Sequence, residues 1–494
     1  MGLGLNGGGE ASVRFFLQHG AYVTVTDMKN KDQLRKTIDS LTNDPRVDKS
    51  RLRYVLGHHD KVDFAEADCV IKNPGVKYEG NEYLAAAKVI ETDISIFLHF
   101  TKAPIIAITG SKGKSSTASA IKYGLNGAKI CSFLGGNITV SPLTFLDRTD
   151  KTTPVVLELS SWQLADLRGR KALKPYVAII TKIVPDHQNF YHSMETYVAD
   201  KRLIYADQTK NDFTIIDADG DEPGTGPEKG GTWGDLFASE TGGTILRYSR
   251  NPLPDTVFGA WQEKLQNGNF RGVARLPRYL LSQDAKNNYD DTETILGELS
   301  VPGTHMRTNV LNAALVMRIM GIQPSETIRI LSGWTGIPHR LQYFHVWNCN
   351  GTSVKFYNDS CSTVPEATAA ASQAFGKPVI LLCGGTDKGL SQEPLANTLA
   401  CLNGEIPVSA LYLLKGTATD ILMPLLRKKD IRYRGPFDSL TAMLEQVKTD
   451  LQTTIPVKQS EIAVVFSPGS TSFGMFMNEF DRGNKFMEEA KKIF

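Results

Sequence analysis

Cysteine and long apolar stretches are both scarce in this sequence. Its six cysteines are scattered over 494 residues, and no two of them form a C-x-x-C pair. That distribution favours reduced thiols in the cytosol over a disulfide framework. No apolar stretch is long enough to span a bilayer, and no basic segment followed by an apolar one opens the chain. We therefore expect a cytoplasmic protein without membrane insertion.

An excess of one charge is also lacking. The formal net charge is +2, which gives no electrostatic reason to expect nucleic acid as a partner. Hydrophobic residues make up 41% and charged residues 22% of the chain, as in ordinary globular proteins. The length exceeds what a single hydrophobic core supports, so we expect roughly two to four domains.

The first domain is expected over residues 1–101. A glycine-rich opening is followed by a helix over 13–19, a strand over 22–26 that ends at Asp27, and a further strand over 68–71. Glycine loop, helix, strand and acidic residue is the order of a Rossmann-like half. The strand that should precede such a loop is absent, because the loop begins at the first residue. Either the domain lacks this strand or the start site is placed too late. We favour the second, since that strand normally lies centrally in the sheet.

The second domain is expected over residues 102–337. A strand over 104–109 leads into a loop rich in Gly, Lys and Ser, and then into a helix over 117–125. Apolar strands over 155–159 and 177–181 follow. Continuous apolar runs of this length are typical of a parallel sheet that is buried on both faces.

The remainder of the chain divides into a segment of unclear periodicity and a third domain. Residues 217–290 are rich in Gly, Pro, Asp and Asn, which predicts a long insertion or an irregular subsheet. The third domain is expected over 338–494 and repeats a strand–helix–strand order. Its predicted strands are 355–357, 378–383, 411–414 and 462–466. This order indicates a second parallel sheet.

The loop Gly110-Ser111-Lys112-Gly113-Lys114-Ser115-Ser116 has the features of a phosphate cradle. Gly110 and Gly113 let the backbone pass close to phosphate oxygens, and the N–H groups of the loop and of the next helix face the anion. Lys114 can reach the outer phosphates, and the hydroxyl of Ser115 or Ser116 can ligate Mg²⁺. Two residues separate the glycines, fewer than in the common P-loop pattern. The sequence therefore predicts ATP as a ligand.

Ionisable residues follow the next two predicted strands. Glu158 ends the first, His187 follows the second, and Lys201 comes fourteen residues after His187. Each of them alone is an ordinary residue: a solvated Glu, a hydrogen-bonded structural His or a solvated Lys. Because the carboxyl ends of parallel strands meet at one edge of a sheet, Glu158 is expected to hold Mg²⁺ on the triphosphate. The three together indicate a second cation site.

Polar loops also recur in the third domain. Arg340 lies at its start, where it can reach a nucleotide phosphate or, alternatively, form an interdomain salt bridge. Three strand-ending loops, Asn358-Asp359-Ser360, 384–388 and 467–472, predict a common crevice facing the second domain. For each loop alone, an ordinary turn is the alternative.

Taken in order, these motifs resemble the Mur ligase family over nearly the whole chain. The resemblance is carried by Leu157-Glu158-Leu159-Ser160-Ser161-Trp162-Gln163-Leu164, Gly336-Ile337-Pro338-His339-Arg340, Asn358-Asp359-Ser360, Ser472-Phe473 with Arg482-Gly483, and the shared phosphate loop. It implies an α/β protein of three domains: an N-terminal Rossmann-like UDP-binding domain, a central P-loop ATPase domain with a parallel sheet, and a C-terminal Rossmann-like domain. It also implies a monomer that joins D-glutamate to UDP-N-acetylmuramoyl-L-alanine through an acyl phosphate, in peptidoglycan precursor synthesis.

The resemblance assigns roles to individual residues. Those implied to bind ATP are Gly110, Ser111, Lys112, Gly113, Lys114, Ser115, Ser116, Thr117, Asn309, Arg340 and Asp359. Those implied to be catalytic are Lys114, Glu158, His187 and Lys201. Ser115 and Glu158 would hold a first Mg²⁺, and His187 and a carbamylated Lys201 a second. Those implied to contact the UDP substrate are Leu5, Asn6, Gly7, Asp27 and Asn137. Those implied to clasp D-glutamate are Thr363, Lys388 and Ser472.

The chain departs from the family pattern at three places. Cys361 stands where a Lys usually follows Asn-Asp-Ser, Met306 replaces the Asn of a His-Asn pair, and Glu479 lies in a reordered Phe-rich stretch. These departures concern amino-acid specificity more than ATP chemistry. Three alternatives therefore stay open: a sister ligase for another amino acid, a non-catalytic nucleotide-binding regulator, and a dinucleotide oxidoreductase suggested by the N-terminal glycines alone.

Overall fold

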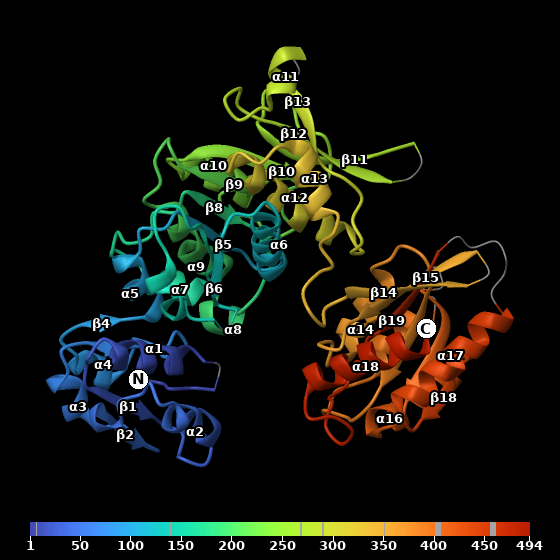
Figure 1. The fold of residues 1–494 in the computed structure, drawn as a ribbon, viewed down its shortest axis with the longest axis horizontal. Helices are drawn as coiled ribbons and strands as arrows, with labels where there is room; N and C mark the ends of the chain where they lie inside the picture. The colour runs from blue at the N-terminus through green and yellow to red at the C-terminus, as the bar shows by residue number, and fades with distance from the viewer. Residues whose placement is uncertain are drawn as a thin grey trace. The chain divides into compact units, whose positions relative to one another are not determined.

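The computed structural model describes residues 1–5, 7–138, 140–266, 269–288, 291–349, 351–400, 407–454 and 461–494. The chain divides into two compact units. Unit 1 comprises Met1–Gly297 and Thr308–Leu331, and unit 2 comprises Glu298–Arg307 and Ser332–Phe494. Helices and strands alternate through both units (Figure 1), so the predicted α/β class is confirmed. The predicted domain boundaries near 101 and 337 stay predictions.

The N-terminal part of unit 1 contains two short parallel strand pairs. β1 (Val23–Asp27) pairs with β2 (Leu52–Leu56), and β3 (Val70–Ile71) pairs with β4 (Ile90–Glu91). The helices around them are α1 (Gly8–Gln18), α2 (Arg35–Asn43), α3 (Lys61–Glu66), α4 (Glu82–Ala86) and α5 (Asp93–Phe100). The strands predicted at 22–26 and 68–71 are thereby confirmed within a residue or two. Among the described residues, no strand joins the two pairs into one sheet.

A nine-stranded sheet forms the centre of unit 1. Its strands are β5 (Ile105–Thr109), β6 (Phe133–Gly136), β7 (Val155–Glu158), β8 (Val177–Ile180), β9 (Phe213–Asp217), β10 (Thr244–Ser249), β11 (Gly259–Lys264), β12 (Phe270–Arg275) and β13 (Thr292–Leu296). The order is β13-β12-β11-β10-β9-β8-β5-β7-β6. Every residue of β5, β7 and β8 is buried, which explains their unbroken apolar sequences.

The prediction that residues 217–290 form an insertion or an irregular subsheet is wrong. β10, β11 and β12 continue the central sheet, with β10 parallel to both β9 and β11. β12 pairs antiparallel with β11 and β13. The polar composition that suggested an insertion belongs largely to the connections between these strands, such as the stretch from 218 to 232.

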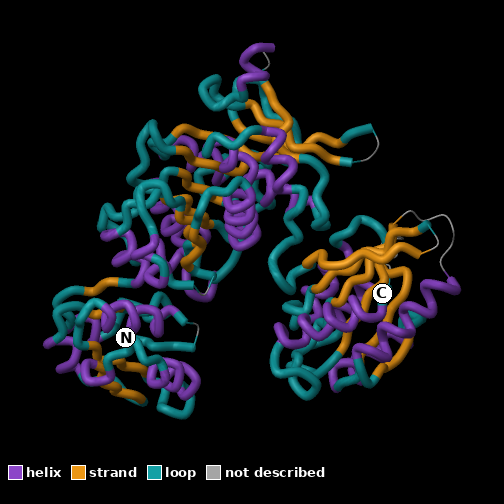
Figure 2. Tube along the Cα trace, viewed as in Figure 1, coloured by secondary structure: helices purple, strands orange, loops and turns teal. Residues whose placement is uncertain are grey.

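The helices of the central region surround this sheet (Figure 2). They are α6 (Lys114–Gly127), α7 (Ser161–Ala165), α8 (Gln188–Tyr191), α9 (Met194–Lys201), α10 (Trp233–Glu240), α11 (Gln283–Asn288), α12 (Thr304–Ile319) and α13 (Pro324–Leu331). The helix predicted to begin at Thr117 begins instead at Lys114. Within the described part of the chain, no helix combines the length and apolarity that crossing a bilayer requires.

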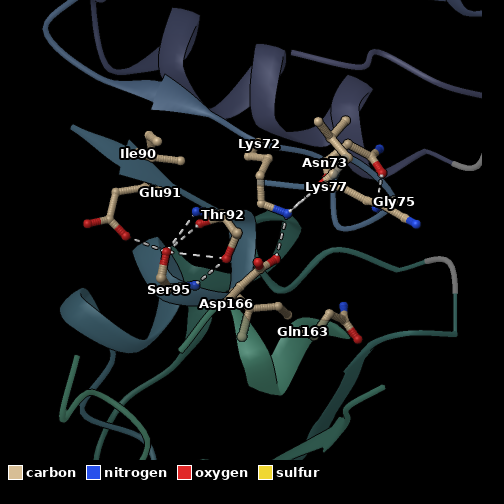
Figure 3. A network of polar contacts seen from close by, with 12 residues as sticks. Lys72, Asn73, Gly75, Lys77, Ile90, Glu91, Thr92, Ser95, Gln163 and Asp166 are labelled. Carbon is tan, nitrogen blue, oxygen red and sulfur yellow. Dashed lines mark hydrogen bonds and ion pairs between the residues drawn. The ribbon is translucent and has the colours of Figure 1, made fainter. Parts of the chain in front are cut away.

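A buried ion pair lies between the strand pair β3–β4 and the segment that follows α7 (Figure 3). The Lys72 ammonium lies 2.9 Å from Asp166 Oδ2, with both side chains almost fully buried. Lys72 Nζ also donates to the Val76 carbonyl at 2.9 Å and to the Asn73 carbonyl at 3.3 Å. The pair therefore fixes the turn after β3 against α7, which carries residues of the candidate site.

Unit 2 has a six-stranded sheet with helices on both faces. Its strands are β14 (Gln342–Cys349), β15 (Thr352–Asn358), β16 (Val379–Gly384), β17 (Val408–Leu414), β18 (Arg434–Phe437) and β19 (Glu461–Phe466). The order is β14-β15-β19-β16-β17-β18, and only β14 is antiparallel to its neighbour. The helices are α14 (Pro365–Gln373), α15 (Glu393–Leu399), α16 (Thr417–Lys428), α17 (Leu440–Thr454) and α18 (Glu479–Ile493). Two separate apolar clusters pack against the sheet. All four strands predicted in this region are present.

Candidate active site

The phosphate loop connects β5 to α6, and its two glycines hold backbone conformations that other residues avoid. Gly110 has φ 138° and Gly113 has φ 95°. A Cβ on Gly110 would lie 2.0 Å from Thr181 Oγ1, and one on Gly113 would lie 2.4 Å from Asn309 Oδ1. Since α6 begins at Lys114, the free N–H groups of its first turn belong to Lys114, Ser115 and their neighbours. This geometry creates an anion site at the helix N-terminus.

Lys114 lies over the loop that precedes it. Its ammonium donates to the Gly110 carbonyl at 2.8 Å and to the Ser111 carbonyl at 3.0 Å. Burial lowers the pKa of Lys114, while the nearby Glu158 carboxylate opposes that shift. The positive charge of Lys114 thus lies at the loop, where it can balance an anion.

Glu158 ends β7 and is nearly fully buried at 2% exposure. Its Oε1 accepts a hydrogen bond from Asn137 Nδ2 at 3.2 Å. Its Oε2 is buried and has no hydrogen-bond partner among the described residues, and the same holds for Thr117 Oγ1. A buried carboxylate oxygen without a partner is unfavourable unless a cation completes its environment. Glu158 therefore suits a metal ion that also binds an anion held by the loop.

Lys201 ends α9 and contacts the same loop. It is 2% exposed, and its ammonium donates to the Gly110 carbonyl at 3.0 Å. The nitrogen also lies 4.4 Å from the centre of the Tyr197 ring. Burial, followed by the charge of Lys114, lowers the pKa of Lys201 to about 7. A substantial fraction of this amine is therefore neutral at physiological pH, which makes it a nucleophile.

His187 lies at the edge of this group. It is exposed and has φ 52°. Its ring is 5.2 Å from that of Trp162 and 6.3 Å from that of Tyr197, centre to centre. The structure thus brings Glu158, Lys114 and Lys201 to one loop, whereas the ring of His187 contacts Trp162 and Tyr197. Within the described ranges, no three His, Cys, Asp or Glu side chains form a ready metal cluster.

Two residues near the loop were not predicted as site residues. Asp186 lies 3.4 Å from the Lys112 ammonium, and Tyr197 shares a 3.0 Å hydrogen bond with Ser111 Oγ. The sequence signal for Asp186 was its place next to His187, in the segment that follows the buried strand β8. Tyr197 gave no separate signal, because an aromatic residue on a helix usually packs in the core.

A cavity of about 1000 Å³ extends from the glycine-rich opening to the central sheet. Of the residues expected to contact the UDP substrate, Asn137 lines it. Asp27 instead holds the opening loop: its carboxylate accepts from the Gly4 N–H at 3.0 Å and from the Lys29 N–H at 2.9 Å. Leu5 is exposed, Gly7 caps α1 at φ 85°, and Asn6 lies outside the described residues.

The cavity is also lined by residues that we did not predict as site residues from the sequence. They include Lys72 and Asn73 after β3, and Ser160 and Gln163 at the start of α7. The Asn-Pro-Gly turn at 73–75 was the available signal, because it closes a strand at the edge where ligands bind.

In unit 2, Asp359 ties together the loops that follow β15 and β19. Its carboxylate accepts hydrogen bonds from Ser362 Oγ at 2.5 Å, Ser467 Oγ at 2.6 Å and the Leu341 N–H at 3.0 Å. Burial raises the pKa of Asp359 to about 6 despite these donors. Arg340, the other predicted nucleotide contact of this unit, is exposed. Asp359 therefore has a clear structural role in shaping the loops.

The residues expected to clasp D-glutamate lie on loops at the carboxyl ends of three adjacent strands, β15, β19 and β16. Thr363 is half-buried, Ser472 is buried and Lys388 is exposed. The loops after β16 and β19 touch, since the Thr471 N–H donates to the Thr386 carbonyl at 3.0 Å. The three loops therefore share one edge of the sheet. That they form a crevice facing the second domain stays a prediction.

Arg482 on α18 binds the same loops. The sequence indicated it only through Arg482-Gly483, one of the motifs that carry the resemblance to the family. Its guanidinium donates to the Ser360 hydroxyl at 3.0 Å and carbonyl at 2.8 Å, and to the Ser470 and Thr471 carbonyls, both at 3.0 Å. It is 1% exposed, and burial lowers its pKa to about 10. A Cβ on Gly483 would lie 2.2 Å from His339 Nδ1, so no residue larger than glycine fits at position 483.

Comparison with protein families gives two matches within unit 1. The description "Mur ligase MurD-like, N-terminal domain" matches residues 1–96, and "Mur ligase middle domain" matches residues 108–226.

Two relatives match nearly the whole chain. A protein of Treponema pallidum (strain Nichols) is 38% identical, covering 100% of this chain and 97% of its own length. A protein of Borreliella afzelii (strain PKo) is 35% identical, covering 98% of this chain and 95% of its own. Both are named UDP-N-acetylmuramoylalanine–D-glutamate ligase.

Solved structures with the same fold are more distant in sequence. The crystal structure of MurF ligase from Thermotoga maritima in complex with ADP aligns with a TM-score of 0.51 and 15% identity, over 97% of this chain and 96% of that one. A MurF structure from Acinetobacter baumannii aligns with a TM-score of 0.56 and 12% identity, over 96% and 92%. At these identities the likeness concerns the fold alone.

Proposed function

Because the chain belongs to the Mur ligase family, we propose that it joins D-glutamate to UDP-N-acetylmuramoyl-L-alanine with ATP as the energy source. The observation that carries the proposal is the likeness over nearly the full length, at 38% and 35% identity, to two proteins named for that reaction. The phosphate loop, Lys114 and the buried Glu158 are consistent with the ATP-dependent half of it.

The proposed chemistry activates a carboxylate, which is a poor electrophile. The carboxylate of the muramoyl-L-alanine substrate attacks the γ-phosphorus of ATP, the bond to ADP breaks, and an acyl phosphate forms. The amine of D-glutamate then attacks the acyl carbon and loses a proton, and phosphate leaves. Both reactants of the first step are anions, so the site has to offset their repulsion.

The chain's own residues divide this task. The loop from Ser111 to Thr117 would bind the phosphates through its N–H groups and hydroxyls. Lys114 would balance the charge of the γ-phosphate, and Asn309, which lies against Gly113, would contact the adenine. Arg340 and Asp359 would contribute nucleotide contacts from the third domain.

The residues at the loop fit magnesium, because Glu158 offers a buried carboxylate oxygen without a partner in the described chain. Ser115 and Glu158 would hold one Mg²⁺, and His187 with Lys201 would serve a second. Bound there, Mg²⁺ would neutralise phosphate charge and polarise the γ-phosphoryl group.

Lys201 would act as a carbamate. With its pKa lowered to about 7, the neutral amine can add to CO₂, forming an N–C bond and releasing one proton. The product carries a carboxylate in place of an ammonium, which removes the repulsion between Lys201 and Lys114. It also supplies the oxygen ligand that a second Mg²⁺ requires.

The two other substrates would bind at the ends of the sheets. Leu5, Gly7, Asp27 and Asn137, together with Asn6 outside the described residues, would contact the UDP substrate. Thr363, Lys388 and Ser472 would clasp D-glutamate. Cys361 lies in the loop after β15, and burial raises the pKa of its thiol. A thiol is neutral and a thiolate is negative, so Cys361 offers no cation in either state.

A phosphate-release panel tests the proposal. Purified protein is given ATP, Mg²⁺ and UDP-N-acetylmuramoyl-L-alanine with D-glutamate, L-lysine, meso-diaminopimelate or no amino acid. Release only with D-glutamate is the expected result. Equal release with another amino acid would move the protein to a sister activity, and ATP binding without turnover would favour a regulator. Lys114→Ala should abolish release, whereas the same change at the exposed Lys210 should not.

A further inference from the structure

Asp93 is a buried acid that the proposed mechanism does not use. It begins α5, and only 8% of the residue is exposed. It lines the cavity of about 1000 Å³, as do Gly136, Asn137 and Ser141. Within the described ranges, no cation lies close enough to Asp93 to affect its pKa. Burying a carboxylate without a cation is unfavourable, so either a structural role or a ligand has to offset that cost.

The start of α5 does not supply the structural role. Thr92 already caps this helix, because its Oγ1 accepts from the Ser95 N–H at 3.1 Å and its own N–H donates to Ser95 Oγ at 2.8 Å (Figure 3). Asp93 Oδ1 accepts from the Ile94 N–H at 2.9 Å. An ionised carboxylate has about four lone-pair sites, so this bond leaves most of its capacity open to the cavity.

Ser141 is a second polar group beside Asp93 without a structural role for its side chain. It is 3% exposed and lines the same cavity. Its Oγ has no hydrogen-bond partner among the described residues, and it does not cap the short 3₁₀ helix Pro142–Thr144 that follows. Burial raises the pKa of Asp93, while the nearby Ser141 hydroxyl and the Ile94 N–H oppose that rise. A carboxylate and an unused hydroxyl therefore lie side by side at the cavity wall.

Hydrogen bonds connect the segment that carries Ser141 to Glu158. The Gly136 N–H donates to the carbonyl of Val140, the neighbour of Ser141, at 2.8 Å. The Asn137 N–H donates to the Glu158 carbonyl at 2.8 Å, and Asn137 Nδ2 donates to Glu158 Oε1 at 3.2 Å. Asp93 and Ser141 therefore lie at the Glu158 end of the cavity, next to the carboxylate that is proposed to bind Mg²⁺.

Such a pair favours a ligand group that donates a hydrogen bond and carries no negative charge. The ionised Asp93 carboxylate can only accept, and the Ser141 hydroxyl can rotate to accept from a ligand N–H or to donate to a neighbouring oxygen. In UDP-N-acetylmuramoyl-L-alanine, a single carbon separates the alanine N–H from the reacting carboxylate. Because that carboxylate has to lie at the Glu158 end of the cavity, this N–H is the donor of the substrate that lies nearest to Asp93.

We propose that Asp93 and Ser141 bind the amide N–H that L-alanine contributes to the substrate, and that Asp93 excludes the compound without alanine. This proposal rests on the proposed ligase function. UDP-N-acetylmuramate carries a carboxylate where the alanine amide would be. Two carboxylates at close range repel each other, so Asp93 disfavours this compound and accepts a hydrogen bond from the amide instead. Asp93 thereby determines which muramoyl nucleotide the site accepts.

Calorimetric titration at about pH 8, well above the ordinary pKa of a carboxyl group, tests this specificity. The full chain and its variants are titrated with UDP-N-acetylmuramoyl-L-alanine and, separately, with UDP-N-acetylmuramate. The original chain should bind the compound with alanine more tightly. Asp93→Asn should reduce this preference at least tenfold, mainly because UDP-N-acetylmuramate binds more tightly once the charge at position 93 is gone.

Two further variants and the thermal stability serve as controls. Asp63→Asn removes a carboxylate that lines the same cavity but belongs to α3, and it should leave the preference unchanged. Ser141→Ala should weaken binding of the compound with alanine about three- to tenfold, as the loss of one hydrogen bond predicts, without lowering Tm. Asp93→Asn should raise Tm, because a neutral amide is less costly to bury than a carboxylate without a cation.

The outcomes separate this proposal from the proposed function. An unchanged preference in Asp93→Asn, an equal loss of affinity for both compounds, or a lowered Tm would overturn the role of Asp93. Equal affinity of the original chain for the two compounds would overturn it as well. If the original chain bound neither compound, the proposed ligase function itself would fail, and ATP binding by the same sample would show that the protein is folded.

Discussion

Replacing Lys72 with Met should destabilise unit 1 strongly, because it leaves a buried carboxylate without its cation. Met keeps the length and apolar stem of the side chain but removes the ammonium. That ammonium contacts Asp166 at 2.9 Å and donates to the Val76 and Asn73 carbonyls, with 1% and 5% of the Lys72 and Asp166 side chains exposed (Figure 3). Removing one partner of such a pair costs about 3–5 kcal/mol.

The loss should depend on pH in a defined direction. Burial raises the pKa of Asp166 to about 6 even with Lys72 beside it, so the folded state holds this proton more tightly than the unfolded state does. Stability from this group is therefore fully present below its unfolded pKa and is lost as pH rises through about 6. Lys72→Met should raise the pKa of Asp166 further. The stability that the variant loses relative to the original protein should therefore become smaller as the pH is lowered. The change should be at most about 1.4 kcal/mol per pH unit.

Urea unfolding at about pH 5.5 and about pH 8 measures this effect. Tryptophan fluorescence is a suitable signal, because Trp162 lies on α7 close to Asp166. The double variant Lys72→Met/Asp166→Leu should recover most of the loss, since neither charge remains buried. Lys88→Met, at an exposed lysine, should stay within about 0.5 kcal/mol. A loss below about 1 kcal/mol at Lys72, or one independent of pH, would refute the reasoning.

Three further predictions concern the candidate site. Lys201→Ala should lose turnover and regain part of it with acetate or propionate, whereas a folded variant that no carboxylate rescues would exclude the carbamate. Gly113→Ala should weaken ATP binding at least tenfold in calorimetry, because its Cβ would lie 2.4 Å from Asn309 Oδ1; unchanged affinity would contradict the cradle geometry. Arg482→Lys should raise KM for D-glutamate while ATP affinity is kept, since an ammonium cannot replace the guanidinium fork. An unchanged KM would remove Arg482 from the amino-acid site.

The parts of the site that follow from local sequence were predictable. The phosphate loop is a contiguous run between an apolar strand and a helix, and Glu158 directly ends another apolar strand. Both features depend on neighbours in the chain and on the rule that strand ends share an edge. The same rule predicted the common edge of the loops that carry Asp359 and Ser472.

The parts that depend on distant contacts were not predictable. Lys72 and Asp166 are far apart in the sequence, and each alone is typical of the surface. Strands such as β11 and β12 lie toward one end of a large sheet, and apolar and polar residues alternate only weakly along them. The polar connections between the strands therefore determined the composition of residues 217–290. Local composition therefore favoured an insertion where pairing with distant neighbours produced regular strands.

The strand order of unit 2 has a consequence for its synthesis. β15 and β16 both pair with β19, which lies between them and is the last strand of the described chain. While the ribosome is still translating the region before Glu461, β15 and β16 have no shared neighbour and expose the edges that β19 will cover. The sheet can close only after Glu461–Phe466 has been translated. A nascent chain arrested earlier would hold two half-sheets with open, aggregation-prone edges.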